Sequence, residues 1–519
     1  MRTPLSGNRR FVFSLGVRRA WTGMRLAHPS ERLLDAIPGA LAWGALVLVV
    51  VGAYCAPMAV VLGSALLAFY SAVRFLLAAV ANARGLRLIH RWERTDWTAE
   101  YVRRAAPGSL PLDAVHHVVI VPNYGESEST LRRTLDHLSR QFCASTSTTV
   151  VLAMEGQEPG AAGKGALLKA TYEACFAHFL VVVHPKGLSG EMQCKSANQA
   201  WALRSAERTL VGEMGYSPDH LLVTSMDADT IWHPLTFEAL AVLFATDPQR
   251  HKTFWQAPIR YHANVWRINP LLRLVHAYSS AWELAYLSAP WWQALPMSSY
   301  SMSLRLLSKT GYWDTAVIAD EWHMYIKTFF QRRGDVRLQP VFLPFYASAT
   351  TGDTLWQAIK ERYLQTLRHA WGAKEIGYAL SQSIEHTDVS AATGLRLVFR
   401  VAHDNLLSGV GWVIMVLGAQ IPLLFHPAVI QANLRSMPFI LLQVSLAVVT
   451  VLTVVFWAMD LLIRPPRSAP WTWRERLVEL ASVPLLTVMS MLCLALPVIH
   501  AQTRLMLGLP LRFRVAAKE

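Results

Sequence analysis

Two aspartates at positions i and i+2, Asp227 and Asp229, are the residues whose type and spacing most directly indicate chemistry. They follow the run Leu221–Ser225 in the sequence LLVTSMDADTIWH. This run is mostly apolar without alternation, as in a parallel strand covered on both faces. Carboxylates at the end of such a strand reach the crevice where open α/β sheets bind ligands. Hard divalent cations favour one or two such carboxylates, together with waters and substrate phosphate oxygens. A solvated Asp-x-Asp turn is the alternative interpretation.

The composition predicts a membrane protein that carries a soluble insert. The chain has 519 residues and is 53% hydrophobic, so it is too long for one ordinary domain and too apolar for a simple soluble protein. Its net charge of +14 comes from dispersed basic residues that often flank apolar runs. This pattern indicates anionic membrane lipids as partners and argues against nucleic acid. The five cysteines lack disulfide-like or metal-ligand spacing and are expected to be reduced.

Apolar runs long enough to span a bilayer lie on both sides of a soluble stretch. They fall near residues 37–56, 58–80, 406–425, 439–462 and 480–499. The positive-inside rule places the basic N-terminus, and hence the soluble stretch, in the cytoplasm. Counting spans puts the C-terminus outside, whereas its basic tail argues for inside. Pro484 and Pro497 allow a broken or re-entrant last segment, which would reconcile the two.

These observations predict a multi-pass protein of the cytoplasmic membrane with five regions. They are a basic cytoplasmic N-terminus (1–36), two transmembrane helices (37–81), a cytoplasmic soluble domain (82–396), transmembrane or interfacial helices (397–503) and a basic tail (504–519). The spans lack intramembrane charge pairs and inverted-repeat symmetry, which argues against a transporter.

The soluble stretch alternates strand-like and helix-like segments, a pattern typical of βαβ units in a nucleotide-binding α/β domain. The expected strands are 116–121, 148–154, 180–184, 221–225 and 254–257, and the expected helices are 129–141, 165–177, 193–208, 234–244 and 320–332. The glycine-rich segment 160–165, GAAGKG, lacks the spacing and the Ser or Thr of a phosphate loop. It is therefore expected to be a mobile surface loop.

Motifs occur in an order that resembles membrane-embedded inverting glycosyltransferases of the second family, which includes the cellulose and hyaluronan synthases. VVIVPNYGE resembles the first-strand motif that opens the nucleotide pocket, so Pro122, Tyr124 and Glu126 are implied to contact the substrate. Glu155, in VLAMEGQE, stands where the family has an acidic residue near the nucleotide base. The resemblance implies a Rossmann-like domain of the GT-A type inserted between transmembrane helices.

The next two motifs imply how the diphosphate is bound. GEMQCKSANQAW resembles the family's Lys-containing motif, so Lys195 is implied to approach the diphosphate or donor sugar and Asn198 to support it. Asp227 and Asp229 match the metal-binding Asp-x-Asp, which implies a Mg²⁺ or Mn²⁺ cofactor, with Asp227 also contacting substrate. The implied donor is a nucleotide sugar, with UDP expected as the nucleotide.

The family's acidic pair, usually Glu-Asp with Asp as the general base, falls on Asp320 and Glu321 in VIADEWHMYIK. The order is swapped, so either carboxylate is a candidate for the catalytic base. A displacement of about 1 Å can cost roughly a hundredfold in rate, which makes the assignment consequential. The alternative interpretation is that both are acidic residues stabilised at a helix N-terminus.

RYLQTLRHAWG resembles the Gln-x-x-Arg-Trp signature of processive synthases. Gln365 and Arg368 match, whereas His369 stands where Trp is usual. A continuous α-helix would place Trp371 on the same face as Gln365 and Arg368, so all three are expected to bind substrate. FRVAAK, at 513–518, resembles the gating-loop motif of cellulose synthases, with a basic membrane-surface tail as the alternative.

The expected reaction transfers a hexose or N-acetylhexosamine to a growing β-linked polysaccharide, with one displacement inverting the anomeric carbon. Single-sugar transfer to a lipid carrier is one alternative. A degenerate transferase that acts as a scaffold or export subunit is the other, because the acidic pair is swapped and the Trp is missing. The sequence does not identify the sugar, the acceptor, the oligomeric state or an export partner.

Overall fold

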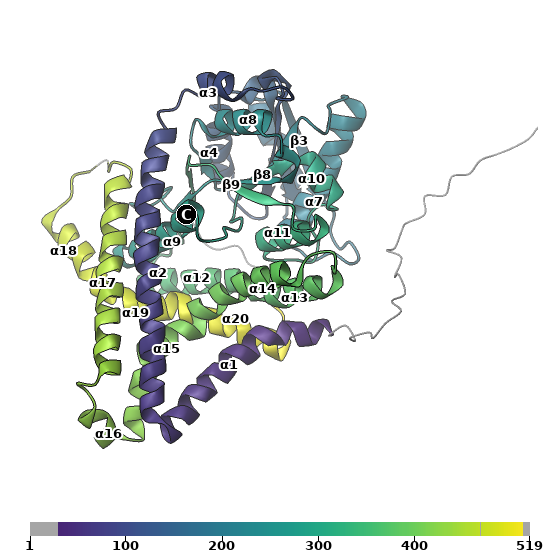
Figure 1. The fold of residues 1–519 in the computed structure, drawn as a ribbon. Helices are drawn as coiled ribbons and strands as arrows, with labels where there is room; N and C mark the ends of the chain where they lie inside the picture. The colour runs from purple at the N-terminus through teal and green to yellow at the C-terminus, as the bar shows by residue number, and fades with distance from the viewer. Residues whose placement is uncertain (1–29, 468, 512–519) are drawn as a thin grey trace, which may run out of the picture.

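The computed structural model describes residues 30–467 and 469–511 (Figure 1). The segment resembling a gating loop, 513–518, and most of the basic N-terminus lie outside the described residues. All five cysteines lie inside them, and all are free thiols.

A mixed seven-stranded sheet forms the centre of the α/β domain, with strand order β3-β2-β1-β4-β8-β6-β9. β1, β2, β3 and β4 are mutually parallel, whereas β8 runs antiparallel to both β4 and β6. The strands are β1 (His116–Asn123), β2 (Thr148–Glu155), β3 (His178–His184), β4 (Leu221–Ser225), β6 (Thr253–Gln256), β8 (Tyr300–Ser303) and β9 (Arg337–Pro340). A second sheet has the order β5 (Ile231–Trp232), β10 (Phe345–Tyr346), β7 (Ile259–Arg260).

Both faces of the central sheet are covered by helices, which explains the continuous apolar runs in its strands. One face packs against α4 (Glu128–Ser139), α6 (Ala161–Tyr172) and α8 (Thr236–Thr246). The other packs against α7 (Lys195–Glu207), α10 (Leu304–Lys309) and α11 (Asp320–Gln331). Successive residues of β1 enter opposite clusters, because side chains alternate along a strand. Burying each large apolar side chain contributes about 1.5–3 kcal/mol to this core.

Each of the five expected strands and five expected helices overlaps an observed element of the same type. The prediction of a mobile loop at 160–165 is wrong, because α6 begins at Ala161. Gly165 packs directly on the sheet, where an added Cβ would lie 2.6 Å from Val181 of β3. The glycine is therefore explained by close helix–strand packing.

Five helical segments are long and apolar enough to cross a membrane. They are α1 (Glu31–Cys55), α2 (Pro57–Trp92), Ala391–Leu424, α17 (Met437–Ile463) and Trp473–Leu507. Each overlaps one of the five expected apolar runs. The last segment comprises α18 (Trp473–Ser482), α19 (Leu486–Ser490) and α20 (Leu496–Leu507), joined by 3-10 and π turns. Pro484 lies in the first interruption and Pro497 is the second residue of α20, just after the second interruption, as expected of a broken helix.

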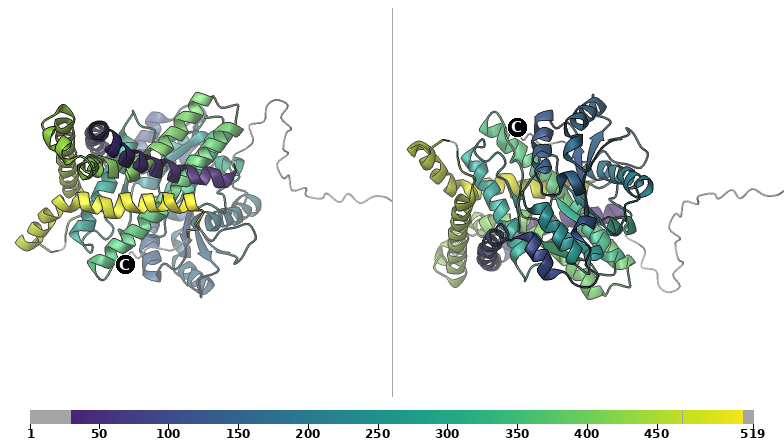
Figure 2. Two further views of the ribbon diagram at one scale, coloured as in Figure 1. Left: turned by 90° about the horizontal axis from the view of Figure 1, so that it is seen from below. Right: turned by 90° about the horizontal axis from the view of Figure 1, so that it is seen from above.

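A layer of shorter helices separates the sheet from the long apolar helices (Figure 1). It contains α12 (Leu355–His369), α13 (Lys374–Glu385) and α14 (Ala391–Leu406), which is the first part of the apolar segment Ala391–Leu424, and α9 (Pro270–Ser288) lies beside it. Beyond this layer α1 and α20 run side by side (Figure 2). The carboxyl ends of β1 and β4 therefore face α12.

Candidate active site

One cavity of about 350 Å³ lies between the carboxyl edge of the central sheet and the helix layer. It brings together residues from β1, from the segment after β4, from the N-termini of α7 and α11, and from α12. Twelve of the residues expected from the sequence line it: Pro122, Tyr124, Glu126, Glu155, Lys195, Asn198, Asp227, Asp229, Asp320, Glu321, Gln365 and Arg368.

The aspartates after β4 occupy different environments. The Asp227 side chain is about one-third exposed and faces the cavity. Asp229 is buried, and its Oδ2 accepts a hydrogen bond from the backbone N–H of Ser348 (3.1 Å). A turn closed by the N–H of Thr230 donating to the carbonyl of Asp227 (3.1 Å) holds the two carboxylates at the strand end. The i, i+2 spacing therefore places both on the same cavity wall.

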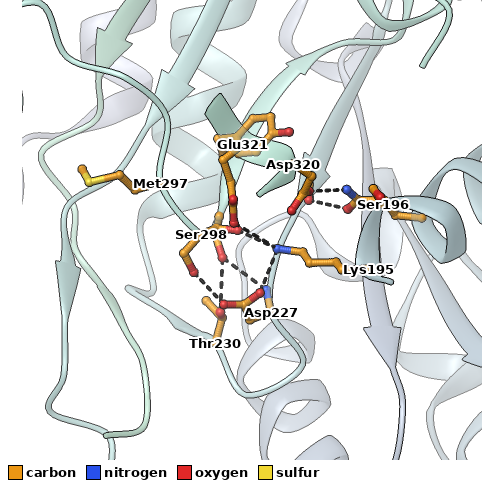
Figure 3. Close-up of polar contacts among 12 residues, drawn as sticks. Lys195, Ser196, Asp227, Thr230, Met297, Ser298, Asp320 and Glu321 are labelled. Atoms are coloured by element: carbon orange, nitrogen blue, oxygen red, sulfur yellow. Dashed lines mark hydrogen bonds and ion pairs between the residues drawn. The ribbon is translucent and has the colours of Figure 1, made fainter. Parts of the chain in front are cut away.

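Lys195 is the central cation of the site (Figure 3). Its Nζ donates to Oδ1 of Asp227 (2.8 Å) and to the backbone carbonyl of Ser298 (2.9 Å), and it lies 3.8 Å from Oε1 of Glu321. Burial alone would lower the pKa of Lys195, but the carboxylates of Asp227, Asp320 and Glu321 outweigh burial and raise it. Lys195 is therefore a fixed positive charge.

Ser298 holds the opposite side of Asp227 and was not expected from the sequence. Its Oγ donates to Oδ2 of Asp227 (2.7 Å), while its carbonyl oxygen accepts a hydrogen bond from Nζ of Lys195 (Figure 3). Its φ of 53° lies in the left-handed region, which costs a non-glycine residue roughly 1–3 kcal/mol and is found preferentially at functional sites. A serine in an otherwise ordinary loop gives no sequence signal for this conformation.

The acidic pair begins α11, and its two members are held differently. Oδ2 of Asp320 accepts a hydrogen bond from Nε2 of Gln199 (2.6 Å), and Ser225 in turn donates to Oε1 of Gln199 (2.7 Å). Glu321 extends toward Lys195 (Figure 3). Burial raises the pKa of Asp320, against the lowering effect of Lys195. Burial, reinforced by the neighbouring charge of Asp320, also raises the pKa of Glu321.

α12 contributes Gln365 and Arg368 to the cavity, one helical turn apart. Nη1 of Arg362 donates to Oε1 of Gln365 (2.8 Å) and fixes its orientation. The structure does not place Trp371 in the cavity. α12 ends at His369, so Trp371 lies beyond it in a 3-10 helix, six residues after Gln365 and on a different side of the chain. Trp371 instead packs against a buried cluster that includes residues of α20, and His369 lines the cavity.

Glu155 belongs to a carboxylate–imidazole–carboxylate chain beside the cavity. Oε1 of Glu155 lies 2.8 Å from Nδ1 of His184, and Nε2 of the same ring lies 2.8 Å from Oε2 of Glu191. Burial raises the pKa of Glu155, although the hydrogen bond to His184 opposes this. Nearby, Nδ2 of Asn198 donates to the carbonyl of Ala153 (2.9 Å), which ties α7 to the end of β2.

Glu283 of α9 is a further cavity residue that was not expected from the sequence. Its Oε2 is buried without a hydrogen-bond partner, which is costly for a carboxyl oxygen. Burial raises the pKa of Glu283 to about 8, even though Arg362 and Arg260 act to lower it. The only sequence signal is an acidic residue in the largely apolar stretch SSAWELAYLS.

The charge of the cavity fits the binding of a cation. Two basic residues, Lys195 and Arg368, face seven acids: Glu126, Glu155, Asp227, Asp229, Glu283, Asp320 and Glu321. Within residues 30–467 and 469–511, no group of three His, Cys, Asp or Glu side chains is arranged to hold a metal alone. Asp227 and Asp229 supply hard oxygen donors, so a Mg²⁺ or Mn²⁺ ion would need further oxygens from substrate or water.

Comparisons with known proteins leave the family open. No family model matches the sequence, and no curated protein matches it. Among solved structures, the chain is similar to the mannosyltransferase PcManGT from Pyrobaculum calidifontis in complex with GDP-Man and Mn²⁺. The two are 16% identical over 77% of this chain and 99% of that chain, with a TM-score of 0.39. At this identity and score the likeness is weak and assigns no function to this chain.

Proposed function

We propose that the protein is a membrane-bound glycosyltransferase that moves a sugar from a nucleoside diphosphate to an acceptor hydroxyl with inversion at the anomeric carbon. The observation that carries this proposal is the convergence of three chain segments, at 195, 227–229 and 320–321, in one cavity. Paired oxygen donors, a fixed cation and a carboxylate of raised pKa are the groups that such a transfer requires.

The charged residues that line the cavity indicate how a nucleotide-sugar donor would bind. A diphosphate would be repelled by so many carboxylates unless a cation accompanied it, and Asp227 and Asp229 would hold that cation. A divalent cation bound there supplies Lewis-acid stabilisation to the departing nucleoside diphosphate. Lys195 and Arg368 add fixed positive charge for the oxygen that becomes negative as the glycosidic bond breaks. Pro122, Tyr124, Glu126, Glu155 and Asn198 would surround the nucleoside.

Glu321 is the carboxylate we assign as the general base. Asp320 is already held by Gln199, whereas Glu321 extends toward Lys195 within the cavity. Its raised pKa suits a group that accepts a proton near neutral pH. The acceptor oxygen would bond to the anomeric carbon as its proton passes to Glu321, while the carbon–oxygen bond to the diphosphate breaks. One displacement of this kind inverts the configuration without a covalent intermediate.

We further propose that the acceptor is a growing β-linked glycan. Gln365 and Arg368 lie between the carboxylates and the apolar helices, where an acceptor would enter. A UDP-linked hexose or N-acetylhexosamine is the expected donor, and a family-two assignment rests on the motifs alone. Transfer of one sugar to a lipid-linked acceptor is the competing activity. A product ladder on a gel would indicate polymerisation, and one glycolipid species would indicate single transfer.

The decisive experiment is a screen of radiolabelled nucleotide sugars, with Mg²⁺ or Mn²⁺, against membranes that contain the full-length protein. Incorporation should be lost in Asp229→Ala and retained in Asp388→Asn, which removes a carboxylate on the surface outside the cavity. Failure of every donor to be hydrolysed or incorporated by correctly folded protein would support a scaffold or export role instead.

A further inference from the structure

A second cavity, of about 560 Å³, lies where α17 ends and α18 begins, outside the candidate active site. Its lining residues include three arginines and three tryptophans: Arg464, Arg467, Arg476, Trp266, Trp457 and Trp471. We call it the arginine–tryptophan cavity. Trp266 belongs to the loop between β7 and α9, so the α/β domain and the apolar helices both contribute to it.

The positive charge of this cavity is not fully balanced by the described residues. Glu479 is its one acidic lining residue, and it accepts from both Arg464 and Arg273 (2.6 Å each). Arg464 is 2% exposed and its Nε also donates to Oδ2 of Asp460 (2.6 Å), but its Nη2 atom is buried without a hydrogen-bond partner. Arg476 is exposed and forms no ion pair within the described chain. A buried guanidinium nitrogen with no acceptor favours the binding of an anion.

Tryptophan rings hold these guanidinium groups in place. Arg467 lies over Trp471 and Trp266, at 5.3 and 5.9 Å from the ring centroids, and Arg464 lies 6.0 Å from Trp266. Such contacts restrict long side chains. One nitrogen of Arg467, Nη2, donates to Oε1 of Glu475 (2.5 Å), and the other N–H groups of this guanidinium form no hydrogen bond within the described residues, so they can meet a further acceptor. Phosphate oxygens match guanidinium donors well.

The position of the cavity indicates which phosphate would reach it. α17 is an apolar helix that ends at Ile463, directly before Arg464. α18 exposes Trp473, Leu477, Val478 and Leu480, each with more than half of its surface accessible. Both helices therefore offer apolar surface beside a cationic cavity, as a lipid with an acyl tail and an anionic head requires. The cavity lies at the end of α17 opposite α16 (Pro427–Ala432), on the side of the α/β domain (Figure 1).

We propose that the arginine–tryptophan cavity binds the phosphate-bearing headgroup of an anionic phospholipid, with the acyl chains along α17 and α18. Arg467 and Arg476 would contact the phosphate from its exposed side, while the unpartnered nitrogen of Arg464 faces it from within. This binding site does not depend on the proposed transferase activity.

The test compares the double variant Arg467→Gln/Arg476→Gln with a matched control, Arg87→Gln/Arg396→Gln. The control removes two exposed arginines from other apolar segments, outside both cavities. Arg464 is left intact, because its removal would take one cationic partner from each of the buried carboxylates Asp460 and Glu479. Binding of phosphatidylglycerol and phosphatidylcholine with identical acyl chains would be measured by native mass spectrometry on the detergent-purified full-length protein.

We expect preferential retention of phosphatidylglycerol by the wild type and the control, and at least a tenfold weaker preference in the double variant. Equal retention of the two lipids, or equal loss in both double variants, would overturn the proposal. Binding of inorganic phosphate is measured separately. If phosphate depends on the same arginines and phosphatidylglycerol binds no more tightly than phosphate, the lipid assignment is wrong. Should the double variant fail to fold, Arg476→Gln alone replaces it, because this exposed side chain forms no ion pair within residues 30–467 and 469–511.

Discussion

His323 makes the stability of the α/β domain depend on pH in a direction that the structure specifies. The ring lies on α11, two residues after Glu321, and both its nitrogens face carboxylates. Nδ1 lies 2.9 Å from Oε2 of Glu375, and Nε2 lies 2.8 Å from Oδ2 of Asp314. Burial alone would lower the pKa of His323, but Glu375 and Asp314 outweigh it and raise the pKa to about 9. The folded protein therefore keeps this imidazole protonated at neutral pH.

The size of the effect follows from the two pKa values. A pKa that rises from about 6.5 in the unfolded chain to about 9 in the fold corresponds to on the order of 3 kcal/mol. Because the folded pKa is raised, this contribution is complete below pH 6.5 and is lost as the pH rises through 9. The pKa of Asp314 is lowered, partly by the same contact with His323. The stabilisation from this contact is therefore counted only once, through His323.

The assay is thermal unfolding of the purified protein at pH 6.5 and pH 10, for the wild type, His323→Gln and the control His90→Gln. His90 is exposed on α2 and forms no ion pair within the described residues. The wild type and the control should lose about 6 °C more than His323→Gln between the two pH values, given roughly 2 °C per kcal/mol for a large domain. The effects of other titrating groups on the melting temperature cancel when the losses of the three proteins are compared.

The outcome that refutes the reasoning is a parallel loss of stability in all three proteins between pH 6.5 and 10. It would mean that His323 is neutral in the fold and that its carboxylate contacts do not outweigh burial. A lower melting temperature for His323→Gln at both pH values, with no change in slope, would show lost packing against Tyr378 and no linked proton.

Three further predictions concern the cavity. Glu321→Gln should lower kcat at least a hundredfold with little change in nucleotide-sugar affinity, as isothermal titration alongside turnover would show; a loss of donor binding instead would remove Glu321 from the role of base. Glu283→Gln should melt at a higher temperature than the wild type, because its raised pKa makes ionisation costly; this advantage should grow as the pH rises from 4.5 to 8 and then level off, whereas a constant offset would contradict it. Chelation should abolish turnover, and Mg²⁺ or Mn²⁺ should restore it in the wild type but not in Asp229→Ala; turnover that persists with excess chelator would exclude the cation.

The parts of the site that could be predicted are those for which local sequence determines position. Asp227 and Asp229 directly follow a strand that is apolar throughout because both its faces are buried, and Asp320 and Glu321 begin a strongly patterned helix. Other elements took their positions from tertiary contacts and not from local sequence. β8 reads Tyr-Ser-Met-Ser, with no clear strand pattern, yet it is fully buried between β4 and β6.

Three residues show why the rest could not be predicted. Trp371 lies beyond the end of α12 and packs against residues of α20, a contact between distant parts of the chain that periodicity arguments cannot detect. Ser298 acts through a left-handed backbone conformation imposed by its surroundings. Glu283 enters the cavity because α9 packs beside α12, a contact between elements far apart in the chain, through Arg362 and Ser279.

The helix layer between the sheet and the apolar helices limits how the protein can be dissected. Gln365, Arg368 and Asn405 line the candidate active site, while Leu367 and Ala370 on the adjoining surface pack against Val498 and Ala501 of α20. A fragment trimmed to the soluble stretch would expose this apolar surface to water and lose the support behind one wall of the site. Work on the chemistry of this chain therefore calls for the intact protein in detergent or nanodiscs.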